Sequence, residues 1–545
     1  MGLASRFSPG MLPGMLPRAL AMSALACLAP DSLVADAGRK ALFEGKVVRL
    51  ELRIPPEGVA ALRERPRERV DVVLAEPGLG RWEKVGLRLK GNSSFRPIDD
   101  PRPGFSLRLG REIPGQRYRG MDVFQLNNSA QDDTYLNELI GGMMARHAGV
   151  PASRCALVLL SVNGAARGVY VLKEGFDREF LAGFHRSGEG ALFDGGLHND
   201  IHPGLEEDLG SPGGKAALAE FAAALAEPDA ARREARLGRI LDIDGYLRHL
   251  AVENLLVHMD GYSYRANNYR AYHDPATGRF GFVFHGMDNL LGVDAWGQSH
   301  VRGYVLSVPA VAPLYPGASE TAVARALWSL PPESRIRERF RREAVATYAR
   351  FFRDADWPAR AEAKAAELGR GIAALDPAEG AAFEGRSREF LRKLRARLDV
   401  ARAQFADVER LAAPGRGPVD LGAYAWACSA EGGESREGES EGRRALTLRV
   451  SGGRADARLP LSLEPGAYRL SATVACAGLK GAAFRARLSG ADPESYPALS
   501  ADGPWRSHVA TLEVGPGDAT LVLELRGEAG EARVDLAGLR LERLR

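Results

Sequence analysis

Cysteine and long hydrophobic runs are scarce in this sequence of 545 residues. It contains four cysteines, and none forms a C-x-x-C pair, which argues against a structural zinc site. Beyond the N-terminal segment, no stretch approaches the roughly 18–20 uninterrupted apolar residues that span a bilayer, so we expect no transmembrane segment. The net charge is also small, since 73 Lys and Arg against 70 Asp and Glu leave +3. No nucleic-acid partner is therefore expected.

Lysine is also rare, since the chain has nine Lys and 64 Arg. Together with abundant Ala, Gly and Pro, this bias is typical of a GC-rich genome, so a single Arg carries little information. A Lys at a position where Arg could do the same work is more informative about function. With 45% hydrophobic and 26% charged residues, the chain is neither one small module nor globally disordered, and its length predicts two or three domains.

The N-terminus has the pattern of an export signal. A small apolar run at 19–29 precedes Ala35-Asp36-Ala37, which fits the A-x-A cleavage pattern. Residues 1–37 are thus predicted to be a signal peptide or leader, and the protein to be secreted or in the cell envelope. Pro17 lies close to the apolar run, so a disordered leader is the alternative. A lipid anchor at Cys27 is disfavoured, because the residue three before it is not Leu.

Alternating apolar and polar residues predict an N-terminal sheet. The expected strands are 46–55, 70–75, 84–90 and 105–109. A helical pattern at 133–148 predicts a helix inserted into this sheet. Two hairpins are expected, 155–162 with 168–173 through Asn163-Gly164, and 268–273 with 279–285. Period-3.6 patterns predict helical regions at 214–258 and 320–408.

The last part of the chain is predicted to be all-β. The Gly-, Ser- and Glu-rich stretch 414–443 is expected to be a linker, and 444–545 to hold seven short strands. The fold class is therefore α+β, with a sheet-then-helices body followed by an all-β jelly-roll sandwich. Cys428 and Cys476 fall in this last part, and both pairing and free thiols remain open.

Polar residues gather most densely between 254 and 292. Asp260 and Asn268 precede one strand of the second hairpin, and Asp288 ends the other, at the same end of the pair. Phosphoryl transfer needs such a set, with one Asp to orient the attacking hydroxyl and an Asn and a second Asp to hold Mg²⁺. The alternative is turn chemistry, because Asn and Asp cap hairpins routinely.

The order of elements favours the first interpretation. In protein kinases a β-rich lobe with one inserted helix precedes a helical lobe, and the catalytic and metal Asp residues follow at short spacing. This chain has that order, with Asp260 and Asp288 28 residues apart. It lacks the H-R-D, D-F-G and G-x-G-x-x-G strings of eukaryotic kinases.

A set of short motifs resembles the spore-coat CotH-type kinase family, an atypical protein-kinase-like fold. The motifs, in chain order, are Lys90-Gly-Asn-Ser-Ser-Phe95, Leu126-Asn-Asn128 with Asp133-Thr134, Val162-Asn-Gly164, Gly168-Val-Tyr-Val-Leu-Lys-Glu174 with Asp177, Asn267-Asn-Tyr269, and Met287-Asp288 with Gly292. The resemblance covers about residues 45–405. It implies a two-lobe body, β-rich then helical, that transfers the γ-phosphate of ATP to Ser or Thr of a protein substrate with Mg²⁺ or Mn²⁺.

The resemblance also assigns residues. Asp260 matches the family's catalytic Asp, Asn268 the Asn of its N-Y-x-x-Y string, and Asp288 an Asp of its W-D-x-D string. The turn containing Asn92 and Ser93 resembles the phosphate-covering loop.

The remaining cofactor residues are assigned in the same way. Either Lys90 or Arg108 is expected to place a cation on the phosphates, with Glu138 as a partner. The segment from Val171 to Glu174 would be the hinge that contacts adenine.

One position departs from the family. Where the family has W-D-x-D, this chain has His285-Gly286-Met287-Asp288, so the first Asp is missing. If the metal depends mainly on that carboxylate, the kinase is weak or dead, and the protein is a non-catalytic envelope or matrix binding protein. One carboxylate and an amide still suffice for Mg²⁺ if phosphates and waters complete its shell.

The C-terminal hundred residues resemble jelly-roll sandwiches of the galactose-binding or carbohydrate-binding type. Stacking on a sugar ring requires exposed aromatic side chains, and the candidates are Tyr424, Trp426, Tyr496 and Trp505. Glycan binding and a plain accessory role both remain open.

Overall fold

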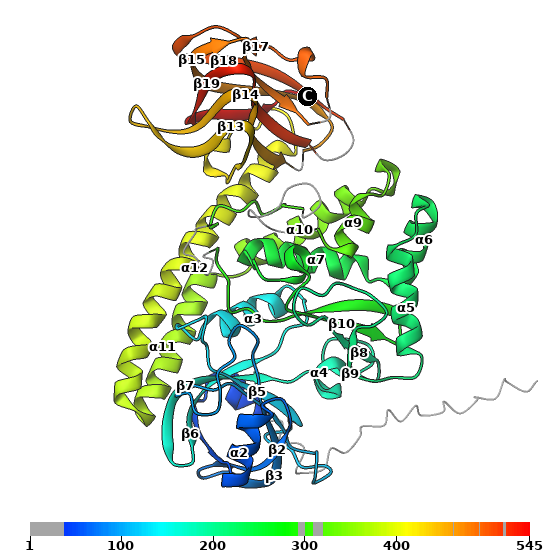
Figure 1. The fold of residues 1–545 in the computed structure, drawn as a ribbon, viewed down its shortest axis with the longest axis vertical. Helices are drawn as coiled ribbons and strands as arrows, with labels where there is room; N and C mark the ends of the chain where they lie inside the picture. Colours follow the sequence, from blue (N-terminus) through cyan, green and yellow to red (C-terminus); the bar gives the residue numbers. More distant parts are fainter. Residues whose placement is uncertain (1–37, 293–299, 309–319, 462, 490, 516–518) are drawn as a thin grey trace, which may run out of the picture.

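The computed structural model describes residues 38–545 except 293–299, 309–319, 462, 490 and 516–518. The expected leader, with Cys27, lies outside the described residues. Figure 1 shows three parts along the long axis, a barrel at the bottom, a mainly helical part in the middle and a β region at the top.

Seven strands near the N-terminus close into a barrel with the order β1-β2-β3-β4-β5-β7-β6. They are β1 (Val48–Arg53), β2 (Val70–Glu76), β3 (Gly80–Leu89), β4 (Phe105–Arg108), β5 (Val123–Asn127), β6 (Cys155–Val162) and β7 (Ala165–Glu174). Alternate residues of these strands point inward and form a separate apolar core. The sequence predicts six of these strands and misses β5. Closure depends on the parallel pairing of β1 with β6, which alternation alone does not reveal.

Two helices interrupt the barrel strands. The expected inserted helix is α3 (Asn137–His147), between β5 and β6. The helix α2 (Pro56–Glu64) lies between β1 and β2 and was not expected. The predicted hairpin of β6 and β7 is confirmed, since the two strands pair antiparallel around Asn163-Gly164.

The middle part combines a small sheet with helices. Its sheet has the order β11-β10-β8-β9, with β8 (Ala191–Asp194), β9 (Glu206–Leu209), β10 (Tyr269–Asp274) and β11 (Arg279–Phe284). The helices are α4 (Arg178–Ala182), α5 (Gly214–Leu225), α6 (Ala230–Ile240), α7 (Ile243–Leu256), α8 (Tyr262–Arg265), α9 (Ala322–Trp328) and α10 (Ile336–Arg353). The hairpin of β10 and β11 was expected, whereas β8 and β9 are four residues each and have too little alternation to predict.

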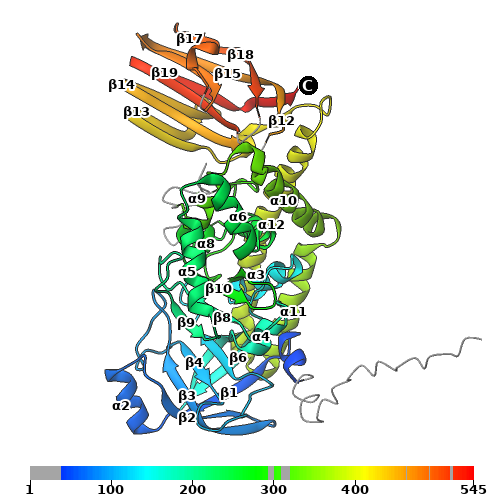
Figure 2. The same cartoon turned by 90° about the vertical axis from the view of Figure 1, so that its right-hand side faces the viewer.

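Two long helices connect all three parts. The helices α11 (Trp357–Leu375) and α12 (Pro377–Leu411) form a hairpin that rises from the barrel to the C-terminal β region, as both views show (Figures 1 and 2). At the lower end, Lys364 donates to the carbonyl of Glu44 at 2.6 Å. At the upper end, Arg543 donates to the carbonyl of Ala412, also at 2.6 Å.

The C-terminal region is an antiparallel β structure. Its strands are β12 (Val419–Asp420), β13 (Ala427–Ser440), β14 (Arg443–Leu461), β15 (Gly466–Lys480), β16 (Ala483–Leu488), β17 (Ala498–Leu499), β18 (Gly503–Val514) and β19 (Ala519–Arg543). Two predicted strand pairs are single long strands, because β14 and β19 continue through their glycines while paired with each other.

The stretch expected to be a linker contains β13. Its residues are mostly exposed and have low intrinsic β propensity, yet β13 pairs with β14 over most of its length. Pairing to a strand that is already fixed overrides composition at this edge of the sheet.

None of the described helices is both long and apolar enough to cross a membrane. Cys428 is exposed, Cys476 and Cys155 are buried, and all three are free thiols.

Candidate active site

A cavity of about 270 Å³ is lined by residues of the barrel, of α3 and of the loops beside β10 and β11. Asp260, Asn268 and Asp288, which the sequence predicts to converge, all line it. From the barrel side come Lys90, Asn92 and Ser93, and from α3 comes Glu138. Seven of the nine predicted site residues are thus brought to one cavity.

Two neighbouring amides hold the carboxylate of Asp260. Asn267 donates to its Oδ1 at 2.9 Å, and Asn268 donates to its Oδ2 at 2.8 Å and to its backbone oxygen at 2.9 Å. Asn268 has φ +48°, in the left-handed region that Asn tolerates better than most residues. These bonds fix the orientation of Asp260, which a general base requires.

The buried carboxylate of Glu253 on α7 holds the loop that carries Asp260. Glu253 on α7 is fully buried, contacts His249 at 3.2 Å and accepts the backbone N–H of Ser263 at 3.2 Å. A Cβ on Gly261 would lie 2.1 Å from Oε1 of Glu253, so a larger residue here would displace that carboxylate. His258 Nε2 donates to the carbonyl of His285 at 3.0 Å. The loop of Asp260 is therefore tied to the strand that leads to Asp288.

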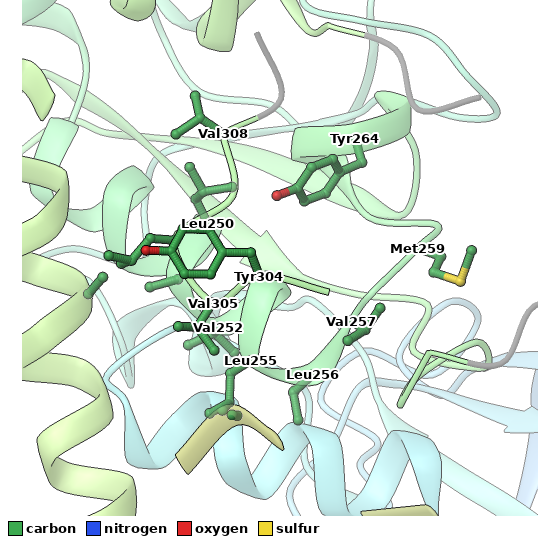
Figure 3. Packing of buried hydrophobic residues seen from close by; sticks show 14 of the residues in the cluster. Leu250, Val252, Leu255, Leu256, Val257, Met259, Tyr264, Tyr304, Val305 and Val308 are labelled. Carbon is green, nitrogen blue, oxygen red and sulfur yellow. The ribbon is translucent and has the colours of Figure 1, made fainter. Parts of the chain in front are cut away.

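Apolar packing supports the same loop. Figure 3 shows Leu255 and Leu256 at the end of α7 packed with Val257 and Val305. The guanidinium of Arg397 on α12 is fully buried and donates to four carbonyls, those of Asn254, Leu255, Val301 and Gly303. Burial lowers the pKa of Arg397 to about 10. α12 thereby fixes the segment before Asp260 and the segment after Asp288.

Asp288 and Asn268 are the residues that fit a divalent cation. Because the amide nitrogen of Asn268 bonds Asp260, its Oδ1 is left as an acceptor near Gly286. Burial, together with Glu138, raises the pKa of Asp288 to about 7. Among the described residues, no group of three His, Cys, Asp or Glu could hold a metal alone. One carboxylate and one amide oxygen suit Mg²⁺ that is shared with phosphates and water.

Position 286 is closed to a larger side chain. Gly286 has φ +60°, and a Cβ there would lie 2.2 Å from Oδ1 of Asn268. The side chain of Asn268 thus occupies the space that the family's first Asp would need.

A buried ion pair lies between the barrel and α3. Lys173 Nζ contacts the two carboxylate oxygens of Glu138 at 2.9 and 3.0 Å, and Nδ1 of His285 at 2.8 Å. Burial and the charges of Lys173 and Arg270 hold the pKa of His285 well below its usual range, so its Nδ1 accepts the bond. All three N–H groups of Lys173 are therefore engaged. Protein kinases place a Lys–Glu pair between their β-rich lobe and a helix in this way.

Lys90 is the less compensated cation of the cavity. Its ammonium donates to Oδ1 of Asn127, an uncharged acceptor. Burial, followed by the charge of Lys173, lowers its pKa to about 8. The turn that begins at Gly91 follows directly, and Asn128 fixes it by donating to the carbonyl of Ser94 at 3.0 Å. This arrangement offers an anion one ammonium group and a polar turn.

Two predicted cofactor residues lie away from the cavity. Arg108 is half exposed and faces Asp122 at 3.7 Å on the outside of the barrel. Glu174 is buried and accepts bonds from Arg39 and Arg154. Of the segment predicted to be the hinge, only Lys173 lines the cavity. Strand alternation explains this, because Lys173 and Glu174 point to opposite faces of β7.

Arg270 and His285 line the cavity but were not predicted as site residues. Lys173 was expected only as part of the hinge and Asn267 only as part of a motif, and both line the cavity. Lys173 had a detectable signal, since it is a rare Lys that follows the apolar residues 169–172 in a strand. For Arg270 and His285, which belong to a hairpin of ordinary composition, the sequence contains no such signal.

The aromatic candidates of the C-terminal region divide into two pairs. Tyr424 and Trp426 are 1% and 8% exposed and belong to the core, so neither can stack on a sugar. Tyr496 and Trp505 are partly exposed. Arg443 and Arg533 already lie over the ring of Trp505, with guanidinium carbons 5.2 and 5.5 Å from its centroid.

The cavity combines a fixed Asp, a Lys–Glu pair and an Asn–Asp pair, which are groups that protein kinases use. Residues 87–384 match the family model described as CotH kinase protein, which is more than half of the chain, and the protein belongs to that family. No curated protein matches the sequence.

The C-terminal region matches carbohydrate-binding modules among solved structures. One is TmCBM61 in complex with β-1,4-galactotriose, with 15% identity over 22% of this chain and 88% of that chain and a TM-score of 0.17. Another is the CBM22-1–GH10 part of xylanase 10B from Clostridium thermocellum, with 18% identity, coverage of 22% and 26%, and a TM-score of 0.18. A third is a family 6 module of lichenase 5A from Cellvibrio mixtus, with 13% identity, coverage of 22% and 91%, and a TM-score of 0.16.

Proposed function

We propose that this protein is an exported protein kinase that transfers the γ-phosphate of ATP to Ser or Thr of surface, coat or secreted proteins. The barrel with α3 would be the N-lobe, and the helical part the C-lobe, of a two-lobe kinase body. The C-terminal region would be a jelly-roll accessory module. The convergence of Asp260, Asn268 and Asp288 on one cavity with Lys90 is the observation that supports this function most.

Each side chain has a role that its contacts support. Asp260, oriented by two amides, accepts the proton of the attacking hydroxyl. Lys90 holds the phosphates, and the Lys173–Glu138 pair fixes α3 against the barrel. Asn268 and Asp288 would hold Mg²⁺ or Mn²⁺. Such an ion neutralises charge on the phosphates when bound.

A second candidate function is a non-catalytic binding protein of the envelope or matrix. Gly286 favours it, because the first family carboxylate is missing and Asn268 fills its place. Glycan binding by the C-terminal region would belong to either function, and Trp505 and Tyr496 are the aromatic residues exposed enough for it.

An assay with radiolabelled ATP separates the two functions. Purified protein is incubated with Mg²⁺ or Mn²⁺ and a mixture of Ser- and Thr-containing proteins, as wild type, Asp260→Asn and Asp288→Ala. We expect transfer by wild type and a loss of about 10²–10⁴-fold in Asp260→Asn, the range for a missing general base. Equal signal from all three proteins would exclude the kinase function.

A further inference from the structure

A second cavity, of about 430 Å³, adjoins the first at its mouth. The two share Lys90, Gly91, Asn92, Asp194 and Arg270 in their linings, so a chain that enters the first passes along the second. The second cavity is a groove with two different walls. One is built by the barrel and the other by the small sheet.

The barrel wall of the groove is cationic. It carries Arg67 and Arg88, and neither has a carboxylate partner among the described residues. Arg67 is nevertheless held in place, because it donates to the carbonyl of Gly91 at 2.5 Å and lies 4.9 Å from the centroid of Phe95. Its remaining N–H groups are available to an anion.

Neighbouring cations add to this wall. Burial lowers the pKa of Arg69 to about 10, and the positive charges of Arg88 and Arg108 are the next largest causes. The barrel surface beside the groove therefore carries several cations, of which Arg108 faces Asp122 and Arg88 has no carboxylate partner among the described residues.

The opposite wall contains three carboxylates, but two of them are already paired with an arginine. Asp194 and Asp208 are both bonded to Arg270, at 2.7 and 2.6 Å. Glu206 is the one carboxylate of the lining without an ion-pair partner in the described chain. The uncompensated charge of the groove is therefore mainly that of Arg67 and Arg88.

We propose that this groove selects protein substrates with Asp or Glu beside the acceptor hydroxyl, and that Arg88 and Arg67 bind those carboxylates. The proposal rests on the proposed kinase function. A single ion pair between guanidinium and carboxylate in a partly exposed groove contributes little binding free energy. Such pairs give specificity mainly because they attract acidic peptides and repel basic ones. Because they are screened, the selection should weaken as salt rises.

Charge reversal at Arg88 tests the proposal without disturbing the turn, because in the described part of the chain Arg88 makes no hydrogen bond or ion pair with residues 91–94. Three peptides of equal length carry one Ser flanked by Glu, Gln or Lys, and initial rates are measured with labelled ATP for wild type and Arg88→Glu. Wild type should prefer the Glu peptide over the Lys peptide by at least fivefold in kcat/KM. Arg88→Glu should abolish or invert that preference while KM for ATP stays within twofold.

The matched control is Arg81→Glu, an exposed arginine of the same strand that pairs with Glu83 outside the groove. It should keep the wild-type preference. Equal rates with all three peptides, or an unchanged preference in Arg88→Glu, would overturn the proposal. A higher KM for ATP with the peptide preference intact would also overturn it, because the groove would then hold the nucleotide.

Binding measured by fluorescence anisotropy keeps the test independent of catalysis. If no peptide is phosphorylated, the affinities of the labelled peptides still decide whether the groove selects acidic chains, and the assay with radiolabelled ATP and the protein mixture decides the kinase function separately. Tighter binding of the Glu peptide by wild type, lost in Arg88→Glu, supports the groove. Equal affinities refute it.

Discussion

The two lysines of the cavity differ in how their charges are balanced. Lys173 has a carboxylate and an imidazole as partners, whereas the ammonium of Lys90 has an amide oxygen. A buried charge without a counter-charge costs stability and is kept where a ligand needs it. The charge of Lys173 is therefore balanced by Glu138, whereas Lys90 has no ion-pair partner among the described residues.

Replacing Lys90 by Met should stabilise the protein and weaken nucleotide binding. The folded-state pKa of about 8 lies below the unfolded value of 10.5, so the ammonium costs stability fully below pH 8, and this cost disappears between pH 8 and 10.5. We expect Lys90→Met to gain about 1–3 kcal/mol at pH 7 and little above pH 10.5. Urea unfolding at the two pH values measures this. If Lys90→Met raised the free energy of unfolding equally at both pH values, the charge of Lys90 would not be the cause of the lower stability.

Restoring the family's acid at position 286 should not restore a stronger site. An Asp there must adopt φ +60° and displace the side chain of Asn268 from its bond to Asp260. We expect Gly286→Asp to lower both Tm and Mn²⁺-dependent nucleotide affinity relative to wild type. Gly286→Ala is the matched control, because it carries the same backbone strain without a carboxylate. Tighter nucleotide binding by Gly286→Asp would show that Asn268 yields its place.

At the level of elements, α12 fixes the chain segments before Asp260 and after Asp288. Arg397 donates to the carbonyls of Asn254 and Leu255 at the end of α7 and joins them to the carbonyls of Val301 and Gly303. A helix far along the chain thus positions the loop of Asp260.

Arg397→Met should loosen both of these segments. Four carbonyls lose the donor that Arg397 provides, and that of Asn254 keeps the N–H of Val257. Each buried polar group left unsatisfied costs about 1–3 kcal/mol, so a loss of at least about 3 kcal/mol is expected. Amide hydrogen exchange should rise in 254–260 and 301–307. Arg395→Met is the control, because Arg395 lies on the same helix and pairs with Glu362 at the exposed surface. Exchange that rises equally in both variants would refute the role of Arg397.

The α7 loop illustrates a limit of prediction at this scale. The sequence places Asp260 after a helix, and the structure confirms it. The buried pairing of Glu253 with His249 follows from their i, i+4 spacing, but the contact of Glu253 with Ser263 depends on how the loop folds back over α7.

At the level of the whole molecule, the β region is joined to the kinase-like body by a continuous core. One buried apolar cluster contains Tyr304 of the body and Tyr424 of the C-terminal part, whose ring centroids are 5.3 Å apart. Arg302 adds bonds to the carbonyl of Tyr424 and, at 2.7 Å, to Glu437 of β13. The segment after Asp288 therefore touches both parts.

This continuity predicts a single cooperative unfolding transition. Calorimetry of wild type should show one peak for the body and the β region together. Tyr424→Ala, which removes a fully buried ring worth about 3–5 kcal/mol, should split it into two. Two peaks in the wild type would show that the parts are thermodynamically independent.

The sequence alone determined the local features of this protein. Period-2 and period-3.6 patterns predicted most strands and helices, and short polar motifs located Asp260, Asn268, Asp288 and the turn after Lys90, because propensity and capping act between near neighbours. The order of those motifs identified the family.

Only the tertiary structure decided which distant groups meet. The closure of the barrel, the pairing of β13, the partner of Glu138 and the position of Arg397 all depend on strand register and on packing between elements far apart in sequence. Arg108 and Glu174 were wrongly expected at the cavity for the same reason, since one residue of register decides which face of a strand a side chain occupies.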